Sequence, residues 1–545
     1  MAPALPDGLL LKGSTSAPRG RHVVATRSFQ PGEVIATFTS PSLAISDSPS
    51  LAITCSGCLA PGAPVTGELP PVRACGGCRT VAYCSPACQK LDWNSGGHKA
   101  ECKVFRRVRA EGHAYLPTLV RALLHILLRP ELRAAMADLE GHADKFIREG
   151  GQKWADTELQ AMGALQYSGL EKTKENFQEA LEIACKLKIN SFTRLDEDIQ
   201  QTGIFMNPAL SMVNHSCIPN AYTQCIGRNA VLHASREIKK DEEIEISYID
   251  HSLHLANRQE AFRTRYHFRC SCARCKDDLS VYDVCRAYPH LDLNSLSLQP
   301  DIQKMIAKFP TLTPGEKASL NATVEEIFPS CSASIVNLSG PEKAKELRRR
   351  WQACKPLRCA PVPLFAIAPF PDLLADAAVY FMKQGNPDYS LCVSSFIATQ
   401  VDPYISPAPF AIQRVKQMLL LARTGVTLMV RKVPQPSVQY DSLEGRVIRA
   451  VRRVDLSRMC QVLLELIVHY GPTAHSEEWP VVGEAKELLK WQYVGRREEV
   501  SKRFRQIVKN PTGAKERGFL DHDLLDYLRE LSSFCMEIME KEFGA

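Results

Sequence analysis

Residues 211–222 read Ser-Met-Val-Asn-His-Ser-Cys-Ile-Pro-Asn-Ala-Tyr, and the core Asn-His-Ser-Cys-x-Pro-Asn at 214–220 is the most informative stretch of the chain. Four successive residues carry an amide, an imidazole, a hydroxyl and a thiol, and the rigid Pro219 lies just behind them. Packing alone rarely requires such residues together, so the stretch indicates a binding or catalytic loop. Two motifs follow it: Glu-Ile-Ser-Tyr-Ile-Asp at 245–250 and a Cys-x-Cys-x2-Cys cluster at 270–275.

A second array of metal-ligand residues lies between residues 55 and 102. Its four pairs are Cys55-x2-Cys58, Cys75-x2-Cys78, Cys84-x3-Cys88 and His98-x3-Cys102. A Cys-x2-Cys pair turns tightly enough for both sulfurs to reach one ion, and an x3 spacing places both ligands on one helical face. Eight ligands predict two tetrahedral zinc sites, against the alternative of ordinary reduced cysteines. Tyr83 and Trp93 are expected to supply the small core of this region.

Length and composition place the chain among ordinary globular proteins. Its 545 residues suggest about three domains, and 45% hydrophobic with 23% charged residues is typical of a soluble protein. The sequence contains no apolar run of about 18 residues, and Met1–Gly8 does not read as a secretory signal. We therefore expect no membrane span and a cytoplasmic or nuclear location. In such a compartment, clustered cysteines indicate metal, and the nine unclustered ones are interpreted as small buried hydrophobes.

The positive charge is concentrated in one region. The net charge is +7, and residues 73–109 carry eight Lys or Arg against Asp92 and Glu101. A basic surface of this kind can bind nucleic acid or an acidic partner, and it can equally be a solvated face.

Periodicity gives a coarse secondary structure. Residues 8–46 predict two or three short strands, and Pro41–Pro49 is interpreted as a connector. Apolar residues from Leu116 to Leu127 fall on one face of a helix that stops near Pro130, and helical patterning continues through Leu187. Strands are expected again at 230–234 and 243–248. Beyond Cys275 the pattern is helical, with Gly471-Pro472 read as a helix stop.

The order of these motifs resembles that of the SET and MYND domain family of protein lysine methyltransferases. Residues 8–46 and 168–276 carry the resemblance to the SET domain, and the array from Cys55 to Cys102 is similar to a MYND zinc finger. The resemblance implies an α+β fold: a β-rich SET domain, interrupted by a zinc-binding MYND module and a helical insert, and followed by an all-α C-terminal domain. The implied segments are 8–46 (N-terminal part of the SET domain), 47–103 (MYND zinc finger), 104–190 (helical insert), 191–258 (SET core), 259–276 (post-SET zinc segment) and 277–545 (helical C-terminal domain, with TPR-like helix pairs as one option).

The same resemblance implies an S-adenosylmethionine cofactor and a lysine acceptor. Tyr248 and Tyr266 occupy catalytic positions, with Tyr266 and Phe268 matching aromatics of the lysine channel and the cofactor face. The residues implied to bind the cofactor are Arg19, Gly20, Arg21, Asn190, Asn214, His215, Tyr248 and Phe268. Methyl transfer needs a neutral amine, and lysine has a pKa of about 10.4, so an apolar aromatic channel suits the chemistry by disfavouring the ammonium.

The resemblance further implies how three zinc ions are held. One ion takes Cys55, Cys58, Cys84 and Cys88, and the second takes Cys75, Cys78, His98 and Cys102. A third set, Cys217, Cys270, Cys272 and Cys275, ties the tail to the cofactor loop. The partners implied or considered are a protein substrate with a target lysine, and a proline-rich peptide or DNA at the MYND module, with the chain itself a monomer.

Two positions depart from the family pattern. His22 stands where the family loop usually has a second glycine, and Asp241 stands at a turn that commonly has glycine. His22 is the feature that favours a competing interpretation, a catalytically weak SET scaffold that recruits partners. A third reading is a MYND transcription cofactor that touches DNA, suggested by the basic segment.

Overall fold

The computed structural model describes residues 4–13, 20–62, 71–195, 201–288, 307, 312–331, 333–336, 338–360, 364–431, 441–491, 498–510 and 513–544. The chain divides into two compact units. Unit 1 comprises residues 1–248 and 261–269, and unit 2 comprises residues 249–260 and 270–545. The described part of the chain has no helix that is both long and apolar enough to cross a membrane.

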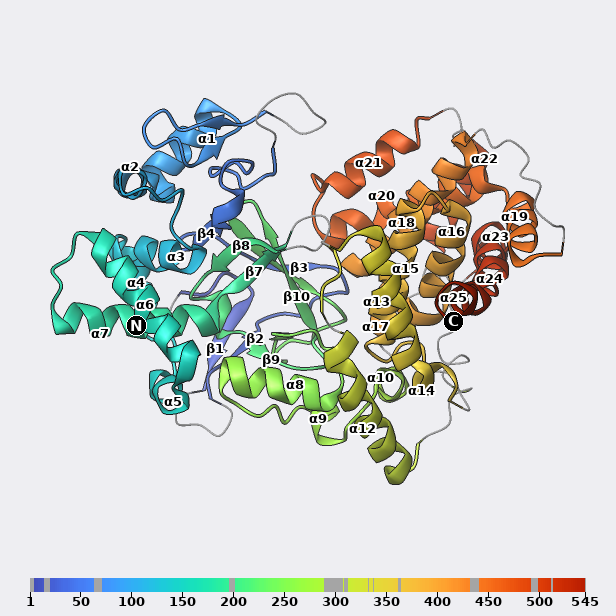
Figure 1. The fold of residues 1–545 in the computed structure, drawn as a ribbon, viewed down its shortest axis with the longest axis horizontal. Coiled ribbons are helices and arrows are strands. Elements are labelled where there is room, and N and C mark those ends of the chain that lie inside the picture. Colours follow the sequence, from blue (N-terminus) through green and yellow to red (C-terminus); the bar gives the residue numbers. More distant parts are fainter. Residues whose placement is uncertain are drawn as a thin grey trace. The chain divides into compact units, whose positions relative to one another are not determined.

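Unit 1 is built on several small, mostly antiparallel sheets (Figure 1). The strands are β1 (Leu9–Lys12), β2 (His22–Ala25), β3 (Val34–Phe38), β4 (Leu43–Ser46), β5 (Arg73–Ala74), β6 (Ala82–Tyr83), β7 (Phe192–Leu195), β8 (Gln201–Met206), β9 (Asn214–His215), β10 (Ala221–Ile226), β11 (Asn229–Ala234) and β12 (Glu245–Ile246). Two three-stranded sheets have the orders β10-β11-β3 and β4-β8-β7, and three strand pairs, β1-β2, β5-β6 and the parallel β9-β12, complete the set.

The pairing of β4 with β8 joins segments that lie far apart in sequence. Leu43 pairs with Met206 and Ser46 with Gly203. Gly203 is required at this crossing, because a Cβ added there would lie 2.1 Å from the carbonyl oxygen of Ile45. The prediction of a Pro41–Pro49 connector is therefore wrong, since β4 occupies its middle and all four β4 residues are buried. The described residues up to Ser46 form four strands, β1 to β4, where two or three were predicted.

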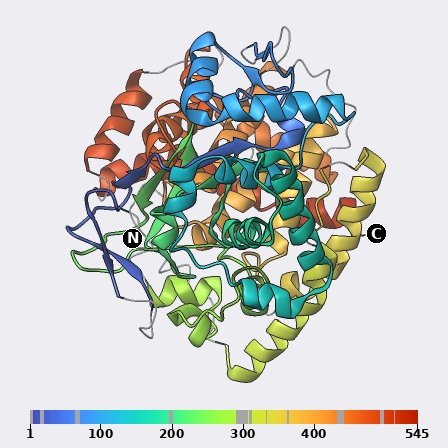
Figure 2. The same ribbon diagram turned by 90° about the vertical axis from the view of Figure 1, so that its left-hand side faces the viewer.

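The helices of unit 1 fall between β4 and β7. They are α1 (Pro86–Leu91), α2 (His98–Ala110), α3 (Thr118–Leu127), α4 (Pro130–Ala135), α5 (Ala143–Glu149), α6 (Gly151–Ser168) and α7 (Lys174–Asn190). The short helical turns η1 (Ser48–Ser50) and η2 (Asp92–Gly96) lie in the same stretch, whereas η3 (Leu210–Met212) follows β8 and η4 (Phe262–Tyr266) follows β12. Helix α6 packs against both α3 and α7, and Figure 2 shows these helices gathered together. The predicted helix that ends before Pro130 and the helical patterning through Leu187 are confirmed by α3 to α7.

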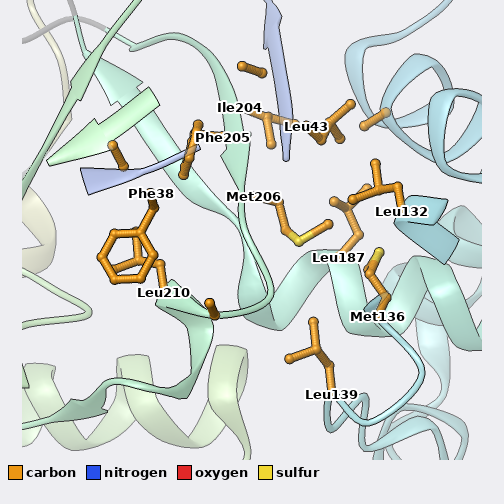
Figure 3. Packing of buried hydrophobic residues seen from close by; sticks show 14 of the residues in the cluster. Phe38, Leu43, Leu132, Met136, Leu139, Leu187, Ile204, Phe205, Met206 and Leu210 are labelled. Atoms are coloured by element: carbon orange, nitrogen blue, oxygen red, sulfur yellow. The ribbon is translucent and has the colours of Figure 1, made fainter. Parts of the chain in front are cut away.

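One hydrophobic core joins the strands of unit 1 to its helices. Figure 3 shows Phe205 and Met206 of β8 between Phe38 of β3 and Leu187 of α7. All of these side chains are at most 2% exposed. This packing holds β9, which follows β8 closely, in a fixed position.

Unit 2 is helical in the part that the structure describes. Its helices are α9 (Ala273–Lys276), α10 (Val281–Ala287), α12 (Pro314–Cys331), α13 (Gly340–Ala353), α14 (Lys355–Arg358), α15 (Phe370–Lys383), α16 (Pro387–Phe396), η6 (Ile397–Val401), α17 (Asp402–Ile405), α18 (Ile412–Val430), α19 (Leu443–Arg453), α20 (Leu456–Ala474), α21 (Pro480–Leu488), α22 (Glu498–Lys509), α23 (Ala514–Leu520), η7 (Asp521–Leu525), α24 (Asp526–Ser532) and α25 (Cys535–Phe543). A further helix, α8 (Leu255–Ala261), spans the boundary between the units. The expected fold class is confirmed: a β-containing part with a helical insert precedes a helical C-terminal region.

The predicted helix stop at Gly471-Pro472 is wrong, because α20 continues through both residues to Ala474. A proline this near the end of a helix removes only one backbone hydrogen bond to the preceding turn. Gly471 is also favoured by packing, since an added Cβ would lie 2.4 Å from the side chain of Val482.

Candidate active site and metal centres

Asn214 and His215, the first two residues of the Asn-His-Ser-Cys segment, form the short strand β9, which pairs in parallel with β12. Asn214 lies opposite Glu245 and His215 opposite Ile246 of β12. The side-chain amide of Asn214 donates to the backbone carbonyl of Arg21 at 3.0 Å and to Glu243 Oε1 at 3.1 Å. This residue therefore joins the N-terminal loop to the segment that leads into β12. Its role in cofactor binding stays a prediction.

Asn220, the last residue of the motif, is a positioning residue that sequence reasoning passed over. It is 1% exposed. Its side chain accepts from the backbone N–H of Glu245 at 2.8 Å and donates to the backbone carbonyl of Glu243 at 2.8 Å. A buried amide that satisfies both groups of a neighbouring strand fixes that strand in place. The Pro219-Asn220 ending of the motif was the feature of the sequence that could have indicated this role.

His215 and Tyr248 lie in direct contact. The backbone N–H of Tyr248 donates to His215 Nδ1 at 3.1 Å, and the other ring nitrogen, Nε2, lies 3.2 Å from the sulfur of Cys217. Because Nδ1 accepts, a neutral His215 carries its hydrogen on Nε2. One imidazole thus connects the tyrosine segment with a predicted metal ligand.

Four aromatic rings gather beside His215: Tyr248, Phe262, Tyr266 and Phe268. The ring of Phe262 lies 4.4 Å from His215 and 5.0 Å from Phe268, and the rings of Tyr248 and Tyr266 are 5.1 Å apart. Phe262 is completely buried, whereas Phe268 is 37% exposed. The structure therefore assembles the predicted aromatic wall and adds Phe262, which its spacing of four residues from Tyr266 on η4 could have revealed.

Both tyrosine hydroxyls are committed as donors. Tyr248 donates to the backbone carbonyl of Val213 at 2.6 Å, and Tyr266 donates to that of Tyr248 at 3.0 Å. Burial raises the pKa of both tyrosines above the ordinary value of 10.0. The two groups are therefore neutral at physiological pH and can offer only their oxygen lone pairs to a bound group.

The N-terminal loop is described from Gly20 onward, and Arg19 lies outside the described residues. Gly20 has a φ of +65°, and a Cβ added to it would meet no atom within 4 Å. The Arg21 guanidinium donates to the backbone carbonyl of Asp138 at 2.8 Å. His22 begins β2, and its Nδ1 lies 3.4 Å from the carbonyl oxygen of Gly20, so this side chain bends back toward its own loop.

Asn190 ends helix α7 and has its amide occupied within unit 1. It donates to the backbone carbonyls of Glu140 at 2.9 Å and Lys186 at 2.8 Å, and its own carbonyl accepts from the Ser211 hydroxyl. Its role in cofactor binding stays a prediction.

The first two predicted metal sets assemble as expected. The ligand atoms of Cys55, Cys58, Cys84 and Cys88 lie within 4.8 Å of one another, and so do those of Cys75, Cys78, His98 and Cys102. A tetrahedral zinc with sulfur ligands at about 2.3 Å requires neighbouring sulfurs about 3.8 Å apart. Cys58 and Cys84 are separated by 3.8 Å, and Cys84 and Cys88 by 3.5 Å. The donor sets therefore fit zinc in number, chemistry and spacing.

A buried ion network stands behind the second metal set. His98 Nδ1 lies 3.0 Å from Glu101, whose carboxylate also accepts from Arg121 at 3.0 Å and from His125 Nε2 at 3.0 Å. Burial opposes ionisation of Glu101, but Arg121 and His125 hold its pKa well below the usual range. A carboxylate behind a histidine ligand fixes the ring orientation for a metal. Arg121 and His125 belong to α3, so the network anchors the second metal set to that helix.

The third predicted set is shared between the units. The sulfurs of Cys270, Cys272 and Cys275 lie within 4.8 Å of one another in unit 2. Cys217 belongs to unit 1, and its participation stays a prediction.

Two other sequence interpretations are settled by burial. Tyr83 is 3% exposed and joins the small core of this region, but Trp93 is 38% exposed, so its predicted core role is wrong. The small core is completed by Leu51, Val72, Val81 and Phe105. Among the nine unclustered cysteines, seven are buried as expected, whereas Cys225 is partly buried and Cys359 is exposed.

Comparison with known proteins gives the class of this arrangement. Residues 20–249 match the family model described as the SET domain, and the chain contains a SET domain. It is 33% identical over 260 residues to "SET domain and MYND-type zinc finger protein 6" of Schizosaccharomyces pombe, covering 48% of this chain and 50% of that protein. It is 28% identical over 274 residues to "Histone-lysine N-methyltransferase ASHR1" of Arabidopsis thaliana, covering 49% and 55%. It is 29% identical over 284 residues to "Histone-lysine N-methyltransferase SMYD3" of Homo sapiens, covering 50% and 62%.

The chain thus spans between 50% and 62% of the length of these relatives, one of which is named for a SET domain and a zinc finger and two for histone-lysine methylation. A solved structure, "Crystal structure of the SET domain of LSMT bound to Lysine and AdoHcy", is 11% identical with a TM-score of 0.21, covering 81% of this chain and 96% of that one. This likeness is too distant to add to the argument.

Proposed function

We propose that this chain transfers the methyl group of S-adenosylmethionine to lysine side chains of proteins. The observation that carries the proposal is the joining of Asn214 and His215 to the aromatic wall of Tyr248, Tyr266 and Phe268. Polar groups that suit a cofactor and aromatic groups that suit a lysine stem are thereby held together. Named methyltransferases among the relatives support the same reaction.

The residues fit the proposed cofactor. Gly20 offers open space where a side chain would otherwise stand, and Phe268 presents a partly exposed ring beside the buried Phe262. Asn214, His215 and the loop at Gly20 and Arg21 would hold the cofactor, and Asn190 is proposed as a further contact. When bound, S-adenosylmethionine supplies an activated methyl group on a positively charged sulfur.

The two tyrosines have a definite part in the proposed chemistry. Their protons are directed to backbone carbonyls, so each hydroxyl oxygen can accept a hydrogen bond from a lysine amine. An amine held in this way keeps its nitrogen lone pair for the attack on the methyl carbon. Because burial raises the pKa of both hydroxyls, neither serves as a general base, and we infer that the lysine proton leaves to water.

We further propose that residues 47–103 form a MYND zinc finger, with Cys217 completing a third zinc set alongside Cys270, Cys272 and Cys275. Structural zinc stabilises folding and supplies no chemistry of its own. A proline-rich peptide or DNA is the proposed partner of the finger, and we propose a cytoplasmic or nuclear monomer. Histone and non-histone proteins are both proposed substrates.

The test combines cofactor binding with methyl transfer. Isothermal titration with S-adenosylmethionine measures binding, and a radiolabelled methyl group measures transfer onto a lysine-containing protein pool. Binding with transfer supports the proposal. If no methyl group is transferred to any protein pool, the result would instead support a SET scaffold that recruits partners, whether or not the cofactor binds.

A further inference from the structure

A cavity of about 320 Å³ lies in unit 1, at the start of helix α2 and against the end of α3. It is of the size that proteins use for small ligands or single side chains of a partner. Its walls come from two segments, residues 93–103 and residues 124–129. Its lining shares no residue with the aromatic wall, and none of the described residues assigned to methyl transfer lines it.

Three cationic side chains, Lys99, Lys103 and Arg129, line the cavity. Lys99 and Lys103 stand one turn apart on α2, both are exposed, and neither makes an ion pair with a carboxylate in the described ranges. Arg129 enters from the end of α3, where Glu131 and the carbonyl of Ser42 fix its guanidinium at 3.1 and 3.2 Å. The cavity therefore presents two uncommitted ammonium groups beside one oriented guanidinium.

In the described part of the chain, one carboxylate lines the cavity, and it is already neutralised. Glu101 is 3% exposed and ion-paired with Arg121 at 3.0 Å. Its bond with His125 also orients that ring. Since a carboxylate only accepts, His125 Nε2 is the donor. The opposite nitrogen, Nδ1, lies toward Gly97, where an added Cβ would be 2.8 Å from it. Nδ1 of the almost completely buried His125 ring thus lies beside the backbone of Gly97, which has no side chain.

The start of α2 adds backbone donors to the same cavity. Gly97 occupies the cap position with a φ of +94°, and no side chain caps the helix. The first amides of a helix have no partner within it and carry a partial positive charge, so they favour anions. Trp93, Leu124 and Leu128 add apolar surface to the lining, and Asn94 and Ala100 complete it.

We propose that this cavity, the α2–α3 pocket, binds a phosphate monoester. Two lysines, an arginine and an uncapped helix start match a compact group with a charge of about −1.5 to −2. The recessed shape suits a single phosphoryl group on a small molecule or side chain. A nucleic-acid duplex needs an extended basic face, which the cavity does not provide.

The first test measures how fast Lys99 and Lys103 are acetylated by an N-hydroxysuccinimide ester, using full-length protein and site-resolved mass spectrometry. Inorganic phosphate and O-phosphoserine are added separately, with chloride at matched ionic strength. At a ligand concentration about ten times the Kd, occupied pockets should slow both reactions about tenfold. Lys90, an exposed lysine outside the pocket, should react unchanged. Slowing by O-phosphoserine alone identifies the monoester as the ligand, and slowing by both probes identifies the phosphoryl group as the recognised part.

The second test uses calorimetry of O-phosphoserine with two matched variants. Lys99→Ala/Lys103→Ala should weaken binding about tenfold or more, because charge-assisted hydrogen bonds are lost. Lys90→Ala/Arg106→Ala removes the same net charge from exposed positions outside the pocket and should bind like the parent. In the calorimetry, equal weakening in both variants would overturn the proposal. In the acetylation test, chloride that slows the two lysines as much as the phosphate probes do would also overturn it. The same holds if an added DNA duplex slows acetylation while neither phosphate probe does.

Discussion

The backbone N–H of Tyr248 donates to Nδ1 of His215 at 3.1 Å, while Nε2 of the same ring lies 3.2 Å from Cys217. A single side chain of the Asn-His-Ser-Cys motif is therefore shared between the aromatic wall and a candidate zinc ligand. This arrangement explains why the histidine stands two residues before the cysteine. Two kinds of residue can therefore be distinguished by mutation: residues that position the cofactor loop, and residues that would contact the acceptor lysine.

Tyr248→Phe should lower methyl transfer by on the order of 10²–10³ while cofactor affinity stays nearly unchanged. The hydroxyl oxygen that would orient the amine is lost, but the contact from the backbone N–H to His215 remains. Radiolabelled transfer and isothermal titration measure the two effects. Tyr222→Phe changes a partly buried tyrosine of β10 outside the aromatic wall and is the matched control. Equal activity in Tyr248→Phe and the parent would assign the role to another residue.

His215→Ala should weaken cofactor binding, and the loss of affinity should be detectable in a binding assay that involves no methyl transfer. The substitution removes the ring that receives the Tyr248 N–H and contacts Phe262. Calorimetry at several cofactor concentrations gives the affinity, and transfer at saturating cofactor gives the rate. His233→Ala, which removes a buried histidine from β11 instead, serves as the comparison. Unchanged cofactor affinity in His215→Ala would contradict the assignment.

Purified protein should contain about three zinc ions per chain, in keeping with the three ligand sets. Cys102→Ser should remove one ion, because the second set loses a ligand. Cys272→Ser should remove another and also reduce methyl transfer. Elemental analysis measures the content, and Cys460→Ser, at a buried cysteine outside the sets, should retain all three. One ion or none in the parent would show that the sets are not zinc sites.

Reversal of charge at Arg106, Arg107 and Arg109 should weaken nucleic-acid binding and flatten its salt dependence, with methyl transfer nearly intact. The structure shows that two of these residues are engaged: Arg107 pairs with Glu111 at 2.9 Å, and Arg109 donates to the carbonyl of Arg79 at 3.2 Å. Arg106→Glu alone is therefore the cleaner variant, and it should reduce the salt slope by about one. If the triple variant binds DNA as tightly as the parent at every salt concentration, the basic face is only solvated and does not bind DNA.

Asp402→Asn should change the pH dependence of unit 2 stability. Burial raises the pKa of Asp402 from 3.8 to about 7, although Arg414 opposes the shift. Between about pH 4 and pH 7 the folded protein keeps a proton that the unfolded chain releases, so the parent loses stability as pH rises. The loss is of order 4 kcal/mol across that window.

The variant should therefore match the parent near pH 4 and exceed it at pH 8. Urea midpoints at both values measure the difference. Asp441→Asn changes an exposed carboxyl of the same unit and should show no such pH-dependent gain. A constant offset between Asp402→Asn and the parent at all pH values would exclude titration of Asp402 as the cause.

Strong periodicity and ligand spacing made much of this fold predictable. The apolar face predicted from Leu116 to Leu127 lies on α3 from Leu119 onward, whereas Leu116 precedes the helix. Eight metal ligands fall into their expected sets because their spacing reflects a geometric need. Strand β4 could not be found in the same way. Its residues are buried on both faces, so they lack alternation, and flanking prolines and serines resemble a loop.

Long-range contacts limited the prediction of the site. The motifs indicated Asn214, His215 and Tyr248, but the role of Asn220 depends on a strand more than twenty residues away. Trp93 was assigned to a core by its residue type, whereas the fold directs it outward. Residue type alone does not show which side of a small module faces solvent.

The pairing of Leu43 with Met206 has a consequence for how the protein folds. The strand that contains Leu43 must await its partner until the cysteine-rich segment and five of the helices that follow have been synthesised. Closing a longer loop costs more conformational entropy, and such distant contacts slow folding. Metal binding by the ligand sets between Cys55 and Cys102 draws that part of the chain together and shortens the effective loop between Leu43 and Met206. Zinc supply during synthesis would then set the rate at which nascent chains mature, with chains made under zinc limitation left with an unpaired strand edge that is prone to aggregate.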